Sequence, residues 1–221
     1  MAGKVGGSDV TSIVIIPKPN HKTLQVKLTG TSPLIMHAWS TKAKQEMLDK
    51  QTKKAKNAKE ARDPDREYEE SIYYLAPPPN ADAPKRLGVL EDWKDVPMAK
   101  RRFCFPANAV KSSVVDACSF VADLTKVLAR GAFFIEDAGV EIIGKPQKRD
   151  DMVTIGMGTK TMRFRGEFEE WHTTFSVVYN ADILSPEMIL NLFAHAGFGA
   201  GMREERPQKD GTGDRFKAEI V

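Results

Sequence analysis

The stretch best suited to chemistry is glycine-rich and lies towards the end of the chain, GFGAGMREERPQKDGTGDRF at 197–216. Glycine lets a backbone approach a ligand closely, and arginine and lysine supply positive charge for phosphate groups. A dinucleotide-binding fingerprint must follow a strand and open a helix, whereas a predicted helix precedes these glycines, and no P-loop sequence occurs. Both nucleotide cradles are therefore excluded. The candidate residues are Gly197, Gly199, Gly201, Gly211, Gly213, Arg203, Arg206, Lys209 and Arg215.

The same stretch supports a second interpretation. It holds four acidic residues, Glu204, Glu205, Asp210 and Asp214, against its four candidate basic residues. That balance is also typical of a mobile surface loop with no ligand.

Basic residues recur in short segments with aromatic neighbours or proline, at 100-KRRF-103, 145-KPQKR-149 and 160-KTMRFR-165. From Thr41 to Arg62, eight Lys or Arg stand against three Asp or Glu. Basic groups neutralise phosphates and exposed rings stack on bases, so the pattern indicates either single-stranded nucleic-acid binding or an ordinary solvated surface. The candidate contacts are Lys50, Lys53, Lys54, Arg101, Arg102, Arg163 and Arg165.

Residues suited to catalysis or metal binding are scattered. No Cys/His cluster has zinc spacing, so we expect neither a metal nor a cofactor. The adjacent pair Asp150–Asp151 points to opposite sides of an extended segment, which is poor geometry for a shared metal. Cys104 and Cys118 are expected to be reduced, buried thiols. His37 and His172 are candidate general bases, but the sequence favours a non-catalytic protein.

Length and composition are those of a globular protein. The 221 residues allow one large domain or two small ones, and 41% apolar residues suffice for a core. No uninterrupted apolar run of about 18 residues occurs, so we expect no membrane partner. Residues 1–22 lack the apolar core of a secretory signal and are expected to form a flexible lead. These features predict a cytoplasmic location.

The hydrophobic pattern predicts an α+β fold. Alternation of apolar and polar residues indicates strands at 23–28 and 173–179. Helical spacing indicates an amphipathic helix from about 106 to 130 that stops at Gly131. Ser185 and Pro186 begin another helix, which ends at Gly197. Other predicted elements are a basic surface helix at 41–61, a short helix at 67–75, and strands at 132–135, 140–143, 152–157 and 217–221.

Without the insertion at 41–95, the order of these elements is βαββαβ. This is the ferredoxin-like or RRM-like arrangement, in which both helices cover one face of an antiparallel sheet. The other face is then free to bind a ligand, as in RNA-recognition modules. We therefore predict one such domain over 23–221, with 41–95 as a basic helical insertion.

Three motifs, in order, resemble the RAMP superfamily, which includes the backbone subunits of CRISPR effector complexes. TSPLIMH at 31–37 resembles the family's first strand and Ser-Pro-Leu loop, and the stretch 196–216 resembles its glycine-rich loop. FPANAVKSSVVDA at 105–117 is similar to the start of its first core helix, with Lys111 in the lysine place and Ser112 where glycine is usual. The segment from MRFRGEFEEW onward also resembles small proteins of tailed phages.

The resemblance implies an oligomer that binds single-stranded nucleic acid. Backbone subunits assemble side by side into a filament along guide RNA, and here Lys111 and the basic insertion would contribute contacts. Some members cut RNA with an aspartate after the first strand, but MHAWSTKAK at 36–44 has no acidic residue. The implied partners are RNA or single-stranded DNA, further copies of the chain, and CRISPR or phage recombination proteins. Two alternatives stay open, a decoy subunit that engages a host CRISPR complex and a metal-independent endoribonuclease that uses His37 or His172.

Overall fold

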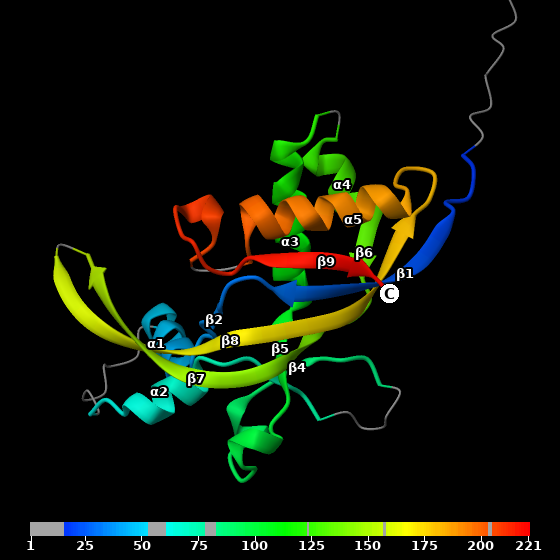
Figure 1. The fold of residues 1–221 in the computed structure, drawn as a ribbon. Coiled ribbons are helices and arrows are strands. Elements are labelled where there is room, and N and C mark those ends of the chain that lie inside the picture. Colours follow the sequence, from blue (N-terminus) through cyan, green and yellow to red (C-terminus); the bar gives the residue numbers. More distant parts are fainter. Residues whose placement is uncertain (1–15, 53–60, 78–82, 123, 157, 203–204) are drawn as a thin grey trace, which may run out of the picture.

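The computed structural model describes residues 16–52, 61–77, 83–122, 124–156, 158–202 and 205–221. In this part of the chain, nine strands form a sheet of antiparallel pairs, which confirms the predicted α+β class (Figure 1). The strands are β1 (His21–Gly30), β2 (Leu34–Met36), β3 (Tyr74–Leu75), β4 (Leu87–Gly88), β5 (Phe103–Pro106), β6 (Phe133–Ile135), β7 (Gly139–Ile155), β8 (Thr159–Asn180) and β9 (Phe216–Ile220).

Five α-helices lie in the described residues, with short 3-10 or π turns between them. The helices are α1 (Thr41–Gln51), α2 (Pro64–Glu70), α3 (Ala107–Ala117), α4 (Lys126–Ala132) and α5 (Pro186–His195). The turns are η1 (Leu90–Asp92), η2 (Met98–Lys100), η3 (Cys118–Phe120), η4 (Ala196–Ala200) and η5 (Pro207–Lys209).

One end of the sheet has the strand order β7-β8-β1-β9, with β9 as the last strand. Alternation along β8 decides which side is buried, because Phe175, Val177 and Tyr179 are at most 4% exposed, as predicted for this face. The ring of Phe175 packs on Phe193 of α5, with a centroid distance of 5.9 Å. The apolar face of β8 is therefore the face that the helices cover.

β1 starts earlier than predicted. Its pairing with β8 begins at His21, opposite Asn180, rather than at Thr23. The lead predicted over 1–22 is therefore too long at its inner end, because strand pairing fixes residues 21 and 22. Residues 1–15 of that lead lie outside the described residues. The alternation at 23–28 places Leu24, Val26 and Leu28 on one face of β1. Val26 and Leu28 are buried, and Leu24 is partly buried.

The helix predicted from about 106 to 130 is two helices. After α3 and the turn η3, Val121 takes an extended backbone with φ of −120°. Thr125 then begins α4, because its Oγ1 accepts a hydrogen bond from the N–H of Leu128 at 3.2 Å. Gly131, predicted as the stop, lies inside α4.

α5 begins as predicted but ends later. The side chain of Ser185 accepts a hydrogen bond from the N–H of Met188 at 3.2 Å, and Pro186 occupies the first turn. Gly197 does not end the helical path, because the chain continues through the π turn η4. Gly201 stops it with a φ of 67°, and its N–H donates to the carbonyl oxygen of Ala196 at 2.8 Å.

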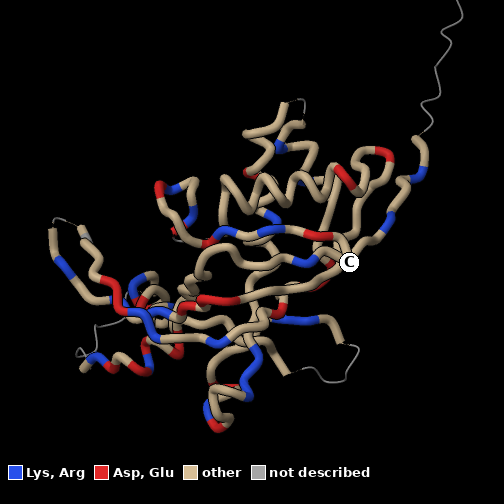
Figure 2. The backbone as a smooth tube through the Cα atoms, viewed as in Figure 1, with Lys and Arg blue, Asp and Glu red and all other residues tan. Residues whose placement is uncertain are grey.

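The strands predicted at 140–143 and 152–157 fall on one strand, the 17-residue β7, which pairs with the 22-residue β8 and ends at Ile155. Gly156 lies in a turn, and residue 157 is outside the described residues. Residues 146–155 of β7 and 159–168 of β8 form an arm that extends beyond the helices (Figure 1). A register shift between Gly144 and Pro146 lets Phe168 and Trp171 both be buried although they are three residues apart. Figure 2 shows basic and acidic residues interspersed along the arm rather than gathered in one basic stripe.

The 41–95 insertion contributes strands as well as helices. α1 has no buried residue among its described positions, which agrees with its lack of an apolar stripe. Of the helix predicted over 41–61, residues 53–60 lie outside the described residues and Ala61 is not helical. The predicted helix at 67–75 spans 64–70 instead. Tyr74 and Leu75 form β3, because both are buried and pair with β4 and β5.

Candidate anion-binding site

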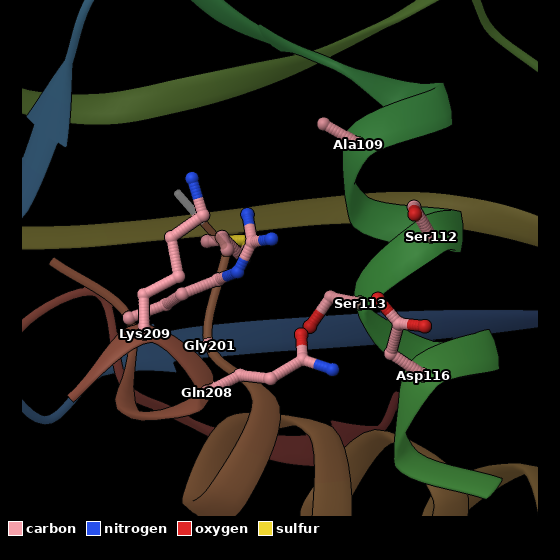
Figure 3. Close-up of a pocket in the computed structure, with 9 residues that line it drawn as sticks. Ala109, Ser112, Ser113, Asp116, Gly201, Gln208 and Lys209 are labelled. Carbon is pink, nitrogen blue, oxygen red and sulfur yellow. The ribbon is translucent and has the colours of Figure 1, made fainter. Parts of the chain in front are cut away.

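A pocket of about 270 Å³ lies between helix α3 and the glycine-rich loop, residues 197–216, that joins α5 to β9 (Figure 3). We call it the α3–loop pocket. Figure 3 shows the helix and the loop facing each other across it. Ala109, Ser112, Ser113 and Asp116 line it from α3, and Arg206, Gln208 and Lys209 line it from the loop.

Two buried polar atoms of this pocket have no hydrogen-bond partner among the described residues. Ser113 is only 5% exposed and its Oγ is unpaired, and the buried Nε of Arg206 is unpaired as well. An unsatisfied buried group costs about 1–3 kcal/mol. Both atoms carry a proton to donate, so the oxygen atoms of an anion are suitable acceptors.

The charges around the α3–loop pocket also favour an anion. Its one carboxylate among the described lining residues, that of Asp116, is 2.8 Å from the Nζ of Lys126 and is compensated by it. Arg206 and Lys209 then leave the pocket positive. A guanidinium and an ammonium that converge with a serine hydroxyl form a donor set typical of phosphate sites.

Asp214 holds the glycine-rich loop in place. Its side chain is fully buried, and its two carboxylate oxygens accept hydrogen bonds from the N–H of Ile35 at 2.9 Å and of Glu205 at 3.2 Å. Its own N–H donates to the carbonyl oxygen of Pro33 at 3.0 Å. The described part of the loop is thus tied to the segment that contains β2, which disagrees with the interpretation of this part as a mobile surface loop.

Three loop glycines allow the chain to pack against itself. A Cβ at Gly197 would overlap the carbonyl oxygen of Phe216, and a Cβ at Gly211 would overlap that of Glu205. Gly201 has a positive φ of 67° and no room for a Cβ beside Arg206. A role for these glycines in the approach of nucleic acid stays a prediction. Gly199 and Gly213 complete the set and face Phe120 and Glu205.

Three of the predicted basic contacts are engaged in ion pairs. Arg101 is bound to Glu69 at 2.9 Å, and only 6% of its side chain is exposed. Arg102 makes two hydrogen bonds to Glu141, at 2.7 and 2.9 Å. Arg165 contacts Asp151 at 3.4 Å on the arm. These side chains stabilise the sheet and its insertion, and their charges are compensated.

The remaining basic candidates lie apart. Lys111 lies on the other flank of α3, where its Nζ donates to the carbonyl oxygen of Arg130 at 2.7 Å, and burial lowers its pKa. Lys50 of α1 and Arg163 of the arm are exposed. The N–H of Arg215 donates to the Oγ of Ser32 at 2.8 Å. Lys53, Lys54 and Arg203 lie outside the described residues.

The open face formed by β1, β9 and the 171–180 half of β8 has no exposed Phe, Trp or Tyr ring among the described residues. Its cross-strand rows include His172 opposite Thr29, and Lys27 opposite both Thr174 and Glu219. The aromatic residues of β1, of β9 and of the 171–180 half of β8 are Trp171, Phe175, Tyr179 and Phe216, and all four are buried. Binding of bases on this face, as RNA-recognition modules do it, therefore has no aromatic platform there.

Sequence reasoning found Arg206 and Lys209 but missed the helix side of the pocket. The signal was present in the small or polar residues at 109, 112, 113 and 116, which recur at helical spacing. What the sequence alone does not contain is the position of the loop over this stripe, which depends on the buried carboxylate of Asp214.

No protein-family model matches the chain, and a comparison with curated proteins finds no match. Within the described residues, no group of three or more His, Cys, Asp or Glu side chains is placed to hold a metal ion. No helix of that part of the chain is both long and apolar enough to cross a membrane.

Proposed function

We propose that this protein binds the sugar–phosphate backbone of single-stranded nucleic acid in the α3–loop pocket and does so without catalysis. The observation that carries the proposal is the convergence of Ser113, Arg206 and Lys209 on one pocket, with two buried polar atoms unpaired among the described residues. A phosphodiester offers these donors two non-bridging oxygens that share one negative charge. Contacts of this kind bind many sequences, so we expect little sequence preference.

The convergence of three distant sequence motifs supports the RAMP resemblance. The motif at 31–37 is bonded to the glycine-rich loop, because Ile35 donates to Asp214 and Thr31 donates to the carbonyl oxygen of Arg215 at 2.9 Å. The motif at 105–117 forms α3 and lines the same pocket. The three motifs thus lie close together in the fold, and two of them, 105–117 and the glycine-rich loop, line the α3–loop pocket.

We also propose that the core is ferredoxin-like. The chain order β1, α3, β7, β8, α5, β9 together with the sheet order β7-β8-β1-β9 supports this assignment. In this proposal β7, β8, β1 and β9 are the four core strands, α3 and α5 are the two helices, and the insertion and the arm are additions.

Assembly into a filament along RNA or single-stranded DNA belongs to the same proposal, with further copies of the chain as partners. The exposed basic helix α1 and the projecting arm are the elements that would reach a neighbouring copy or the strand. The alternatives of a decoy subunit and of an endoribonuclease have less support. Neither His37 nor His172 is among the described residues that line the α3–loop pocket.

The proposal is tested by fluorescence anisotropy with single strands of RNA and of DNA, each about 20 nucleotides long. A charge-assisted hydrogen bond contributes about 1.5–3 kcal/mol, so Arg206→Gln is expected to weaken binding roughly 10- to 150-fold. Loss of one phosphate contact should also make the slope of log binding constant against log salt concentration shallower by about 0.7.

The matched control is Lys217→Gln, which removes one positive charge from the open face of the sheet. It should change the affinity less than twofold at about 0.15 M salt, where distant charges are screened. Equal losses for Lys217→Gln and Arg206→Gln would mean that net charge, and not the pocket, binds the strand. Lack of binding to both strands at about 50 mM salt would refute the proposal, because electrostatic contacts are strongest there.

A further inference from the structure

A second pocket, of about 340 Å³, lies on the opposite flank of α3. Its apolar wall is formed by Leu87, Ala107, Phe134, Ile135 and Ala138, and we call it the Phe134 pocket. Asn108, Lys111 and Asp137 are its polar residues, and the carboxylate of Asp137 accepts a hydrogen bond from the N–H of Lys85 at 3.0 Å. Asn108 lines this pocket and its chain neighbour Ala109 lines the α3–loop pocket, so the two pockets adjoin at the first turns of the helix. Their chemistry differs, because this wall is mainly apolar and aromatic.

Phe134 presents an exposed ring beside this pocket. It lies on β6, where Phe133 is 1% exposed and belongs to the core, whereas Phe134 is 54% exposed on the other side of the strand. Strand alternation places it outward. An exposed ring that lines a pocket offers a flat face on which a planar ligand can stack.

The ammonium of Lys111 covers one face of this ring. Its Nζ lies over the Phe134 ring, 3.7 Å from the centroid, and is 2.7 Å from the carbonyl oxygen of Arg130, which orients the ammonium group. This cation–π contact holds the ring in place and leaves its opposite face for a flat ligand. Asn108, which is exposed at the mouth of the pocket, adds an amide that both donates and accepts hydrogen bonds.

We infer that the Phe134 pocket holds one base of the strand whose phosphate lies in the α3–loop pocket. This inference rests on the proposed function. The helix surface between the pockets presents the small residues Ala109 and Ser112, so a strand backbone can lie close across α3. The base stacks on the face of the Phe134 ring that Lys111 does not cover, and Asn108 offers its amide to the edge of the base. Every base has a π-face, so the pocket is tolerant of sequence.

The test compares a single-stranded DNA of about 20 nucleotides with an abasic strand of the same length and charge. The wild-type protein should prefer the base-bearing strand by about 5- to 150-fold, the range for stacking of one base on an aromatic side chain. Phe134→Ala should remove most of this preference and leave the affinity for the abasic strand unchanged. Phe134→Trp, which keeps an aromatic face, should retain the preference.

The matched control is Phe120→Ala, which removes another phenyl ring that is 52% exposed and lines neither pocket. It should leave the preference intact. Equal wild-type affinity for the two strands overturns the inference but not the proposed function. The inference is also overturned if Phe134→Ala weakens the binding of both strands equally. It is overturned as well if Phe134→Ala changes neither affinity, in which case the pocket serves another ligand, such as a protein partner. Failure of the wild type to bind either strand overturns both proposals.

Discussion

Replacement of Asp214 by asparagine tests the internal architecture of the glycine-rich loop. The carboxylate is fully buried and accepts hydrogen bonds from Ile35 at 2.9 Å and from Glu205 at 3.2 Å. Asparagine keeps one acceptor but loses the charge, and its amide N–H₂ faces a backbone N–H where the second acceptor was. A hydrogen bond to a charged group contributes about 1.5–3 kcal/mol and a neutral one about 1, so the expected loss is about 2–4 kcal/mol.

Backbone strain does not account for this expected loss. Asp214 has a φ of 57°, in the left-handed region, but asparagine adopts that region readily. Asp210 provides the matched control, because it also has a left-handed φ, of 62°, yet its side chain is exposed. Asp210→Asn should change the free energy of unfolding by less than about 0.5 kcal/mol.

Urea denaturation followed by circular dichroism measures the difference. With a denaturant slope of about 3 kcal/mol per molar urea, Asp214→Asn should lower the midpoint by roughly 1 M. A weakened loop should also reduce the affinity for single strands, because Arg206 and Lys209 lie on it. If Asp214→Asn and Asp210→Asn unfold at the same urea concentration, the buried carboxylate does not hold the loop.

Three further predictions concern other parts of the fold. Gly197→Ala should lower the free energy of unfolding in urea by about 1–3 kcal/mol, because its Cβ would overlap the carbonyl oxygen of Phe216. Gly131→Ala inside α4 should raise the free energy of unfolding by about 0.5–1 kcal/mol, because its Cβ would meet no atom within 4 Å. A hydrogen bond from Arg102 lowers the pKa of Glu141 below its ordinary 4.5, so this pair stabilises the fold above that pH and the contribution is lost on acidification. The urea midpoint of Arg102→Gln should therefore lie below that of the wild type at neutral pH. The two midpoints should approach each other as the pH falls below 4.5. Burial raises the pKa of the Cys104 thiol to about 12, so this cysteine should react with a thiol reagent only after unfolding, and rapid labelling of the native protein would contradict its placement in the core.

Local patterns predicted the elements whose periodicity is uninterrupted. The face of β8 with Phe175, the buried side of β1 and the Ser185 cap of α5 all follow from alternation or capping chemistry, which act over a few residues. The prediction of one helix over about 106–130 was wrong because the apolar spacing is continuous there. The side chain of Thr125 nevertheless caps and starts a new helix inside that spacing. In the arm only 152–157 was predicted as a strand, and residues 159–172 of β8 were not, because few of their side chains are buried and no regular apolar alternation marks them.

The sequence shows the two walls of the candidate site but not that they face each other. The basic residues of the loop are visible in the sequence, and so is the small, polar stripe on α3. Their meeting depends on contacts between residues far apart in the chain, such as Asp214 with Ile35, which no local pattern encodes. The same holds for the ion pairs of Arg101 and Arg102, whose acidic partners lie 32 and 39 residues away.

The central claim, that the α3–loop pocket binds phosphate groups, is tested most directly with an uncharged backbone. Binding of a phosphodiester strand is compared with that of a methylphosphonate strand of the same sequence, for the wild type, Arg206→Gln and Ser113→Ala. We predict tight binding of the wild type to the phosphodiester strand only, with both variants weaker on that strand and all three proteins equally weak on the neutral one. Equal wild-type affinity for the two strands, or variants that bind the charged strand as tightly as the wild type, would contradict the claim.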